Sequence, residues 1–227
     1  MDQTVNVLNV RLDNYTAKDA MKLITEYIET EPINTVEIVT PDVLMIASET
    51  EGFKELIEQY DMVIAGDDAI LESAQVNEKK KQDVKNRLFL KMVFRYFHKN
   101  HVRIYILADT EEEINKMKNY FNEERRGIEI VGSSVVPNDD SADDMIINAI
   151  NGAEVDCILA GLSSPVKEYF LGRCKNVLNA KIWLGIGKIE LFLSDKLPLK
   201  DALKDFIEKK VLKRKIEQEK KKQENEI

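Results

Sequence analysis

The chain has 227 residues, 44% hydrophobic and 33% charged, which fits one large or two small soluble domains with a buried core. No apolar run approaches the roughly 20 residues that span a bilayer, and the first residues lack the basic start of a signal peptide, so we expect a cytosolic protein. The formal net charge of −8 argues against a nucleic-acid-binding protein, because phosphate contacts require a positive surface.

Strands and helices alternate along the sequence. Alternating or continuously apolar runs predict strands, whereas apolar residues three and four apart predict helices. Strands are expected at 5–12, 35–39, 61–65, 102–107, 128–131, 155–160 and 181–184. Helices are expected at 16–27, 43–48, 69–75, 88–97, 110–121, 139–150 and 165–178, whereas 79–83 has no period and is interpreted as an exposed loop. This order predicts an α/β fold with a Rossmann-like, mostly parallel sheet flanked by helices.

In such a sheet, ligands bind in the loops that follow the carboxyl ends of the strands. The candidate loops are therefore 40–42, 65–68, 108–110, 161–165 and 185–187. In 161–165, main-chain N–H groups at a helix N-terminus favour an anion such as a diphosphate. The loop is not a P-loop, however, and most turns of this kind bind nothing. The two glycines of 185–187 allow close approach of a backbone, a signal of little specificity.

Two adjacent carboxylates, Asp67 and Asp68, directly follow the strand at 61–65. They can act as a base or bind a cation, but the local pattern favours a simpler role as the N-cap of the next helix. The position of the Asp67 carboxylate separates these interpretations. A carboxylate in a cleft supports chemistry, and one turned into the helix supports a cap.

The chain contains two cysteines and two histidines, too few for a disulfide scaffold or a thiolate zinc centre. Cys157 lies in a predicted strand and is interpreted as a small core residue. His98 and His101 flank a polar helix end and are expected to be solvated. We therefore expect neither a metal site nor a cofactor.

Positive charge is concentrated near the C-terminus, where residues 209–222 contain eight basic and two acidic side chains. Apolar and basic residues follow there at helical spacing: Leu203, Phe206, Ile207, Lys210, Val211 and Arg214. Such a helix can lie on an anionic membrane, gaining about 1 kcal/mol per basic residue near the surface. A helix docked on the body of the protein with a solvated end explains the pattern equally well.

Several segments match the motifs of one family in order and spacing. Thr40-Pro41-Asp42 corresponds to T-P-N, and residues 61–67 to A-D-L-V-I-P-D-G. Residues 103–107 correspond to R-V-F-L-L-G-G, residues 156–168 to D-I-L-F-V-G-L-G-A-P-K-Q-E, and residues 182–187 to a strand ending in G-V-G. With the opening segment 5–14, these pieces resemble the WecG/TagA/CpsF glycosyltransferases of bacterial envelope polysaccharide synthesis.

The resemblance implies transfer of a sugar, typically N-acetylmannosamine, from a UDP donor to a lipid diphosphate-linked N-acetylglucosamine. In the family the transfer inverts the anomeric centre without a metal, and an aspartate of the P-D-G element is thought to be the base. A basic C-terminal segment brings the enzymes to the membrane. By this resemblance we expect a peripheral protein on the inner face of the cell membrane, whose oligomeric state, including a homo-oligomer, stays open.

The sequence departs from the family at several polar positions. The catalytic aspartate falls on Gly66, so Asp67 supplies the carboxylate only if the turn is remodelled by one residue. The asparagine of T-P-N is Asp42, the glutamine of P-K-Q-E is Lys167, and the second glycine after L-L-G is Asp109. Because a general base contributes about 10²- to 10⁴-fold in rate, a non-catalytic homologue remains the alternative, one that binds a nucleotide-sugar or partners an active paralogue.

The sequence therefore predicts a divergent glycosyltransferase with an α/β domain at 1–197 and a basic helix and tail at 198–227. Asp67, followed by Asp68, is the predicted base, and Lys167 would offset the donor diphosphate charge. The predicted substrate-binding residues are Thr40, Asp42, Gly161, Ser163, Ser164, Lys167, Glu168, Gly185 and Gly187. The residues predicted to face the membrane or lipid are Lys210, Lys213 and Arg214.

Overall fold

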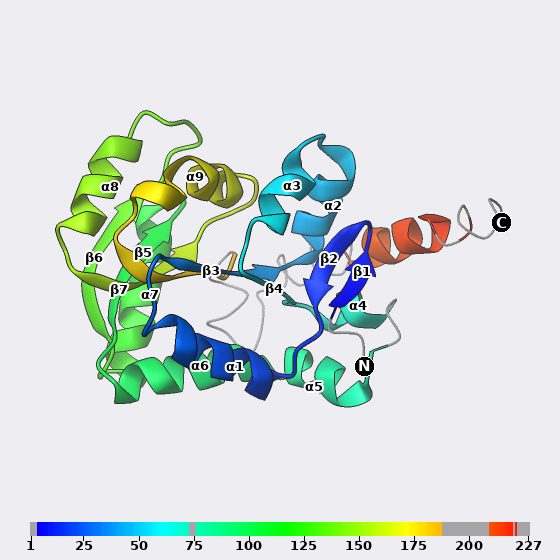
Figure 1. Cartoon of the computed structure of the whole chain (residues 1–227), viewed down its shortest axis with the longest axis horizontal. Coiled ribbons are helices and arrows are strands. Elements are labelled where there is room, and N and C mark those ends of the chain that lie inside the picture. Colours follow the sequence, from blue (N-terminus) through cyan, green and yellow to red (C-terminus); the bar gives the residue numbers. More distant parts are fainter. Residues whose placement is uncertain (1–3, 73–75, 188–208, 220, 222–227) are drawn as a thin grey trace.

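A computed structural model describes residues 4–72, 76–187, 209–219 and 221. Its centre is a six-stranded parallel sheet with the strand order β4-β3-β8-β7-β5-β6 (Figure 1). The strands are β3 (Asn34–Val39), β4 (Met62–Ala65), β5 (Arg103–Ala108), β6 (Glu129–Val135), β7 (Val155–Gly161) and β8 (Ala180–Gly185). The predicted α/β fold with a Rossmann-like parallel sheet is therefore confirmed.

Helices cover both faces of this sheet and enclose two apolar cores. One core lies under α1 (Ala17–Tyr27), α6 (Leu88–Lys99) and α7 (Glu111–Glu124). The other lies under α2 (Pro41–Glu49), α3 (Phe53–Glu58), α8 (Asp143–Asn151) and α9 (Val166–Cys174). Figure 1 shows α1 and α6 on one side of the sheet and α3 and α9 on the other. Burial on both faces explains why the strands read as continuously apolar.

The opening segment forms a hairpin where a single strand was predicted. β1 (Thr4–Val7) and β2 (Val10–Asp13) pair antiparallel around a two-residue turn, in which Leu8 and Asn9 have φ values of 50° and 64°. A hairpin turn of this type is usually signalled by Asn-Gly or Asp-Gly, and Leu8 gives no such signal. β2 also protects the edge of the sheet, because Asp13 Oδ2 accepts the Val63 N–H of edge strand β4 at 2.8 Å.

Residues 79–83, predicted as a loop, belong to helix α5 (Glu78–Lys85). The Asn77 side chain caps this helix by accepting the Lys79 N–H at 2.8 Å. No α5 residue is buried, so the helix has no apolar stripe from which a sequence pattern could predict it. Of the predicted helix 69–75, the structure shows α4 (Asp68–Glu72), and residues 73–75 lie outside the described part.

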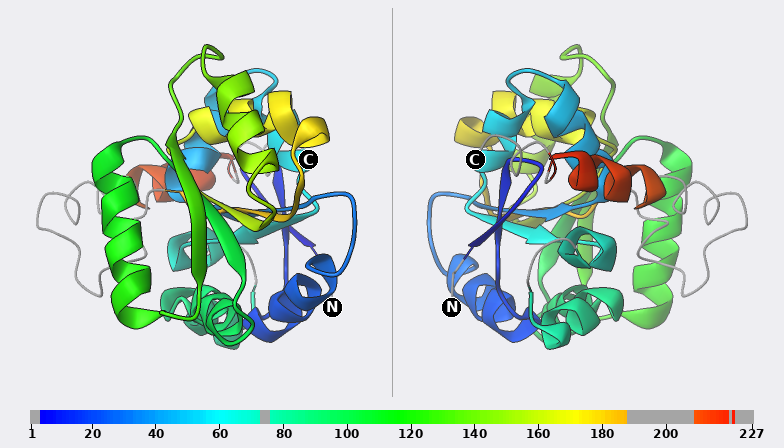
Figure 2. Two further views of the ribbon diagram at one scale, coloured as in Figure 1. Left: turned by 90° about the vertical axis from the view of Figure 1, so that its left-hand side faces the viewer. Right: turned by 90° about the vertical axis from the view of Figure 1, so that its right-hand side faces the viewer.

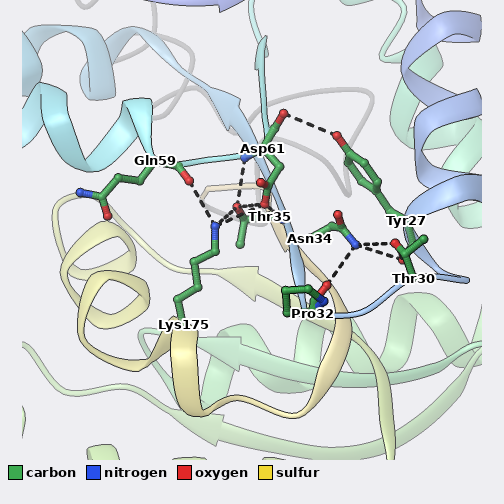
Figure 3. Close-up of polar contacts among 8 residues, drawn as sticks. All are labelled: Tyr27, Thr30, Pro32, Asn34, Thr35, Gln59, Asp61 and Lys175. Atoms are coloured by element: carbon green, nitrogen blue, oxygen red, sulfur yellow. Dashed lines mark hydrogen bonds and ion pairs between the residues drawn. The ribbon is translucent and has the colours of Figure 1, made fainter.

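A polar cluster joins β3 and β4 at their amino ends, opposite the candidate loops (Figure 3). Asp61 Oδ2 accepts the Thr35 N–H at 2.8 Å and the Thr35 hydroxyl at 2.7 Å. The Lys175 ammonium lies 3.3 Å from the same oxygen and 3.2 Å from the Gln59 carbonyl. These contacts fasten the two strands at the far end of the sheet from the candidate loops, so we assign the cluster a structural role.

Candidate active site

The strand order places the candidate loops side by side along one edge of the sheet. Because all six strands are parallel, the loops after β4, β3, β8, β7 and β5 follow one another in space. Five residues mark this edge in order: Asp67, Thr40, Gly187, Ser163 and Asp109. A ligand at this edge can therefore contact several loops at once, wherever their polar groups are not already bonded to the protein.

In the loop at 161–165, the groups predicted to hold a diphosphate are bonded to the protein itself. The Ser163 N–H donates to both carboxylate oxygens of Asp109, at 3.0 and 3.2 Å. The Ser164 hydroxyl donates to Glu168 Oε1 at 2.7 Å. The Asp109 carboxylate thus takes the place of the expected anion, and a phosphate on the Ser163 N–H would meet a like charge there.

Lys167 is fully buried, and its ammonium is paired with two carboxylates. Its Nζ lies 2.5 Å from Glu37 Oε1 and 3.6 Å from Glu168 Oε1, and all three side chains have 0% exposure. Burial raises the pKa of Glu37 to about 8 despite the neighbouring ammonium. Burial by itself lowers the pKa of Lys167, but the Glu37 and Glu168 carboxylates outweigh it and raise this pKa to about 12. This placement differs from the predicted role, because a cation committed to buried carboxylates does not face a donor diphosphate.

Two of the predicted glycines face protein atoms instead of open space. A Cβ atom at Gly161 would overlap Cε of Met117, and one at Gly185 would overlap Oε2 of Glu37. The neighbouring side chains therefore leave little room for a Cβ atom at either position, and this packing explains both glycines without a ligand. Gly187 has a φ of 65° and lies beside Thr40, whose side chain donates to Asp42 Oδ1 at the start of α2.

Asp67 combines the predicted cap with an ion pair. Its Oδ1 accepts the Ala69 N–H at 2.8 Å, and its Oδ2 lies 2.9 Å from Lys209 Nζ. Burial raises the pKa of Asp67, and the Lys209 ammonium and the Ala69 N–H partly oppose this effect. Asp68 is the first residue of α4. One Asp67 oxygen therefore caps α4, as the cap interpretation predicts, and the other pairs with Lys209 of the C-terminal helix.

Gly66 cannot carry an aspartate in this backbone. A Cβ atom there would lie 2.6 Å from Cγ2 of Ile38 and 3.0 Å from the Val39 carbonyl oxygen, and both distances are shorter than normal contacts. The Gly66 N–H also donates to the Val39 carbonyl at 2.7 Å, which holds the turn against β3. A carboxylate for the reaction must therefore come from another position.

A small open cleft, with a cavity volume of about 60 Å³, lies beside Gly66 at the carboxyl end of β4. We call it the β4 cleft. Its polar lining is Asp13, Asn14, Thr16, Lys80, Asp83 and Arg87. Its apolar lining includes Ile38, Ile64, Leu71, Phe89 and Leu90. An apolar cavity with a few convergent polar groups is the usual form of a small-molecule site.

The polar groups of the β4 cleft are held by α1, α5 and the hairpin. Burial raises the pKa of Asp13, against the effects of the Val63 N–H and the Arg11 guanidinium. Asp83 accepts the Ala17 N–H at 3.2 Å, and the Lys80 ammonium donates to the Asn14 side chain at 2.8 Å. Lys80 and Asp83 were not predicted from the sequence, because α5 lacks an apolar pattern. Asp13 and Asn14 were named only as part of the segment 5–14.

The C-terminal helical residues 209–219 pack on the body of the protein (Figure 2). Leu212 is 0% exposed and Ile216 7% exposed, and both belong to the core under α2 and α3. Three of the basic side chains pair with acidic ones, Lys209 with Asp67, Lys213 with Glu72, and Lys215 with Glu49. Of the residues predicted to face a membrane, Lys210 and Arg214 are exposed, and Lys213 is half exposed and paired. Residues 198–208 lie outside the described part.

Among the described residues, none of the helices has the length and apolarity needed to cross a membrane. The same residues contain no cluster of three or more His, Cys, Asp or Glu side chains arranged around a common metal position.

A parallel α/β sheet with a cleft at the carboxyl end of its strands defines a Rossmann-like ligand-binding protein. Comparison with known proteins is more specific, because the model of the glycosyl transferase WecG/TagA/CpsF family matches residues 5–199. The chain belongs to this family.

Two relatives from Staphylococcus aureus carry the name N-acetylglucosaminyldiphosphoundecaprenol N-acetyl-beta-D-mannosaminyltransferase. The protein of strain MRSA252 is 23% identical over 199 residues, covering 85% of this chain and 76% of the relative. The protein of strain NCTC 8325 / PS 47 is 21% identical over the same shares.

Proposed function

We propose that this protein transfers N-acetylmannosamine, or a closely related sugar, from a UDP donor to a lipid diphosphate-linked N-acetylglucosamine. The proposal includes inversion at the anomeric carbon and independence of a metal. The sugar and the lipid-linked acceptor are supported by the family and by the names of the relatives. The observation that carries the proposal is the β4 cleft, which opens beside Gly66, within the segment that resembles the family's P-D-G element.

An inverting transfer needs a base that removes the proton of the acceptor hydroxyl while the anomeric carbon is attacked from the opposite face. We assign this role to Asp13, because its carboxylate lines the β4 cleft and burial raises its pKa towards a value useful for a base. Asp67 remains the prediction from sequence, but the Ala69 N–H and Lys209 occupy its two oxygens.

Positive charge in the β4 cleft comes from Lys80 and Arg87. In place of Lys167, we assign these two residues to the donor diphosphate, whose charge grows as the sugar leaves. Arg87 is well suited to this role, because a guanidinium binds phosphate oxygens in a bidentate manner. Thr40 and Asp42 lie on the neighbouring loop and stay proposed contacts of the donor.

The test measures UDP release from UDP-N-acetylmannosamine with a short-chain, lipid diphosphate-linked N-acetylglucosamine as acceptor. We expect Asp13→Asn to lower kcat about 10²- to 10⁴-fold, and Asp67→Asn to have a smaller effect. Asp144→Asn, at an exposed position of α8, is the matched control. Thermal unfolding of each variant shows whether the loss of the Val63 hydrogen bond has damaged the fold. A large loss of kcat in Asp67→Asn, with kcat unchanged in Asp13→Asn, would identify Asp67 as the base instead.

A second candidate function is a non-catalytic homologue that binds a nucleotide-sugar. Gly66, where an aspartate does not fit, and the self-bonded loop at 161–165 favour it. Calorimetric titration with UDP distinguishes the two. UDP binding without turnover supports the second candidate, and turnover excludes it. If the protein does not bind UDP, both candidate functions are refuted, because each requires a nucleotide-sugar site.

A further inference from the structure

A second segment of the chain is as basic as the C-terminal tail. Residues 78–99, which form α5 and α6, contain eight lysines and arginines and only two acidic side chains, in a chain of net charge −8. Part of this segment, residues 79–83, was predicted to be an exposed loop and is helical in the structure. A surplus of this size on two consecutive helices needs a physical explanation.

Within the described part of the chain, the cations of α6 differ from Lys209, Lys213 and Lys215 of the C-terminal helix in having no acidic partners. Lys91, Arg95 and Lys99 are exposed, and none of them has a carboxylate partner among the residues that the structure describes. They are spaced four residues apart on one helix, so they form a stripe along one side of α6. α6 itself contains no acidic residue. We call Lys91, Arg95 and Lys99 the α6 stripe.

The α6 stripe adjoins an open groove that shares two lining residues with the β4 cleft. Arg87, Leu88, Lys91, Met92 and Arg95 line this groove, and Arg87 and Leu90 also line the β4 cleft. Half-buried Leu88 and Met92 place apolar surface among the cations. The groove also contains acidic residues, Glu123 and Glu124 near the end of α7.

Those acidic residues lie at the far end of the groove. α7 ends shortly before Gly127, whose N–H bonds to His98 at 2.8 Å, near the end of α6. Glu123 and Glu124, together with Arg125, therefore lie nearer the Lys99 end of the stripe than the Lys91 end.

We propose that the α6 stripe seats the protein on an anionic phospholipid membrane. A basic side chain near such a surface gains from its negative potential, and interspersed apolar side chains favour the headgroup region. Bound in this way, the protein would turn the rim of the β4 cleft at Arg87 towards the membrane, which is where a lipid-linked acceptor is found. This last step rests on the proposed function. The acidic net charge makes an extended nucleic acid the poorer partner.

The test is co-sedimentation of the full chain with vesicles of phosphatidylcholine, with and without phosphatidylglycerol. We expect binding only when phosphatidylglycerol is present, and about 30-fold weaker partitioning for Lys91→Gln/Arg95→Gln, from the usual gain per basic residue. The matched control is Lys54→Gln/Lys181→Gln, which removes the same charge from two surface ion pairs on other elements, α3 and β8. Thermal unfolding confirms that each variant is folded.

A third double variant, Lys210→Gln/Arg214→Gln, compares the stripe with the exposed side of the C-terminal helix. The proposal is overturned if this variant loses binding while the stripe variant keeps it. It is also overturned if the control loses as much as the stripe variant, or if the wild type does not bind vesicles containing phosphatidylglycerol. Equal binding of single-stranded RNA would likewise overturn it, by showing a general site for polyanions.

Activity measurements separate this proposal from the proposed function. The stripe variant should retain activity on a water-soluble acceptor and lose it on an acceptor embedded in vesicles, because Lys91 and Arg95 do not line the β4 cleft. Vesicle binding by a wild-type protein without transferase activity would support the membrane proposal and refute the proposed function. The reverse outcome, activity without vesicle binding, would refute only the membrane proposal.

Discussion

Replacing Lys167 with methionine tests whether its ammonium serves the fold or a ligand. The change keeps the length of the side chain and leaves the Glu37 and Glu168 carboxylates buried without their cation. Removing one partner of a buried ion pair destabilises a protein by about 3–5 kcal/mol, which is a large fraction of a total stability of about 5–15 kcal/mol. We expect the urea midpoint of Lys167→Met to fall by roughly 1–2 M.

The assay is urea unfolding followed by tryptophan fluorescence. Trp183 is the only tryptophan of the chain, is 0% exposed, and stacks on Phe170 beside the buried charges, so its emission reports their surroundings. The companion variant Glu37→Gln/Lys167→Met removes one of the two buried carboxyl groups that Lys167→Met leaves without a partner, and it should recover part of the lost stability. A midpoint unchanged in Lys167→Met, together with weaker UDP binding, would refute the structural role and restore the diphosphate role predicted from sequence.

Three further predictions concern pH, the Gly66 turn and the C-terminal helix. Burial raises the pKa of Glu37 from 4.5 to about 8, so the folded protein holds a proton that the unfolded chain releases in this window. Stability should therefore fall as the pH rises from 4.5 to 8, and Glu37→Gln should reduce this slope in urea unfolding. Gly66→Asp should cost about 1–3 kcal/mol through overlap with Ile38, and it should not increase UDP release from the donor. Leu212→Ala should cost about 2–5 kcal/mol in the same unfolding assay, because the docked helix contributes to the core. An unchanged midpoint would show that residues 209–219 are undocked in solution.

The order of strands and helices was predictable from sequence because the sheet is buried on both faces. Its central strands must be apolar throughout, and the helices between them must carry an apolar stripe, so the period of the pattern reveals both. The exceptions are elements whose shape comes from other causes. The hairpin β1–β2 turns at Leu8 and Asn9, so its turn lacks the glycine that usually marks such a position. Helix α5 is capped by Asn77 and buries none of its residues, so no apolar pattern reveals it.

The candidate site was predictable only as a set of loops. Topology places the carboxyl ends of the strands at one edge, but the partner of each polar group is chosen by residues distant in sequence. Asp109 bonds to the N–H of Ser163, 54 positions away, and Glu37 pairs with Lys167, 130 positions away. Neither pairing leaves a signal in the local pattern. The loop at 161–165, predicted to bind a diphosphate, is therefore found with its polar groups already bonded to other residues of the protein.

These pairings also connect two departures from the family pattern that look unrelated in the sequence. Asp109, where the family has a glycine, supplies the carboxylate that occupies the Ser163 N–H. Lys167, where the family has a glutamine, is held inside the protein by Glu37 and Glu168. Both changes remove the loop at 161–165 as an anion site, whereas Lys80 and Arg87 bring positive charge to the β4 cleft. If the protein is an enzyme, its donor diphosphate should therefore depend on α5 and Arg87 instead of the N-terminus of α9. Loss of UDP binding in Arg87→Gln but not in Ser164→Ala would establish that shift.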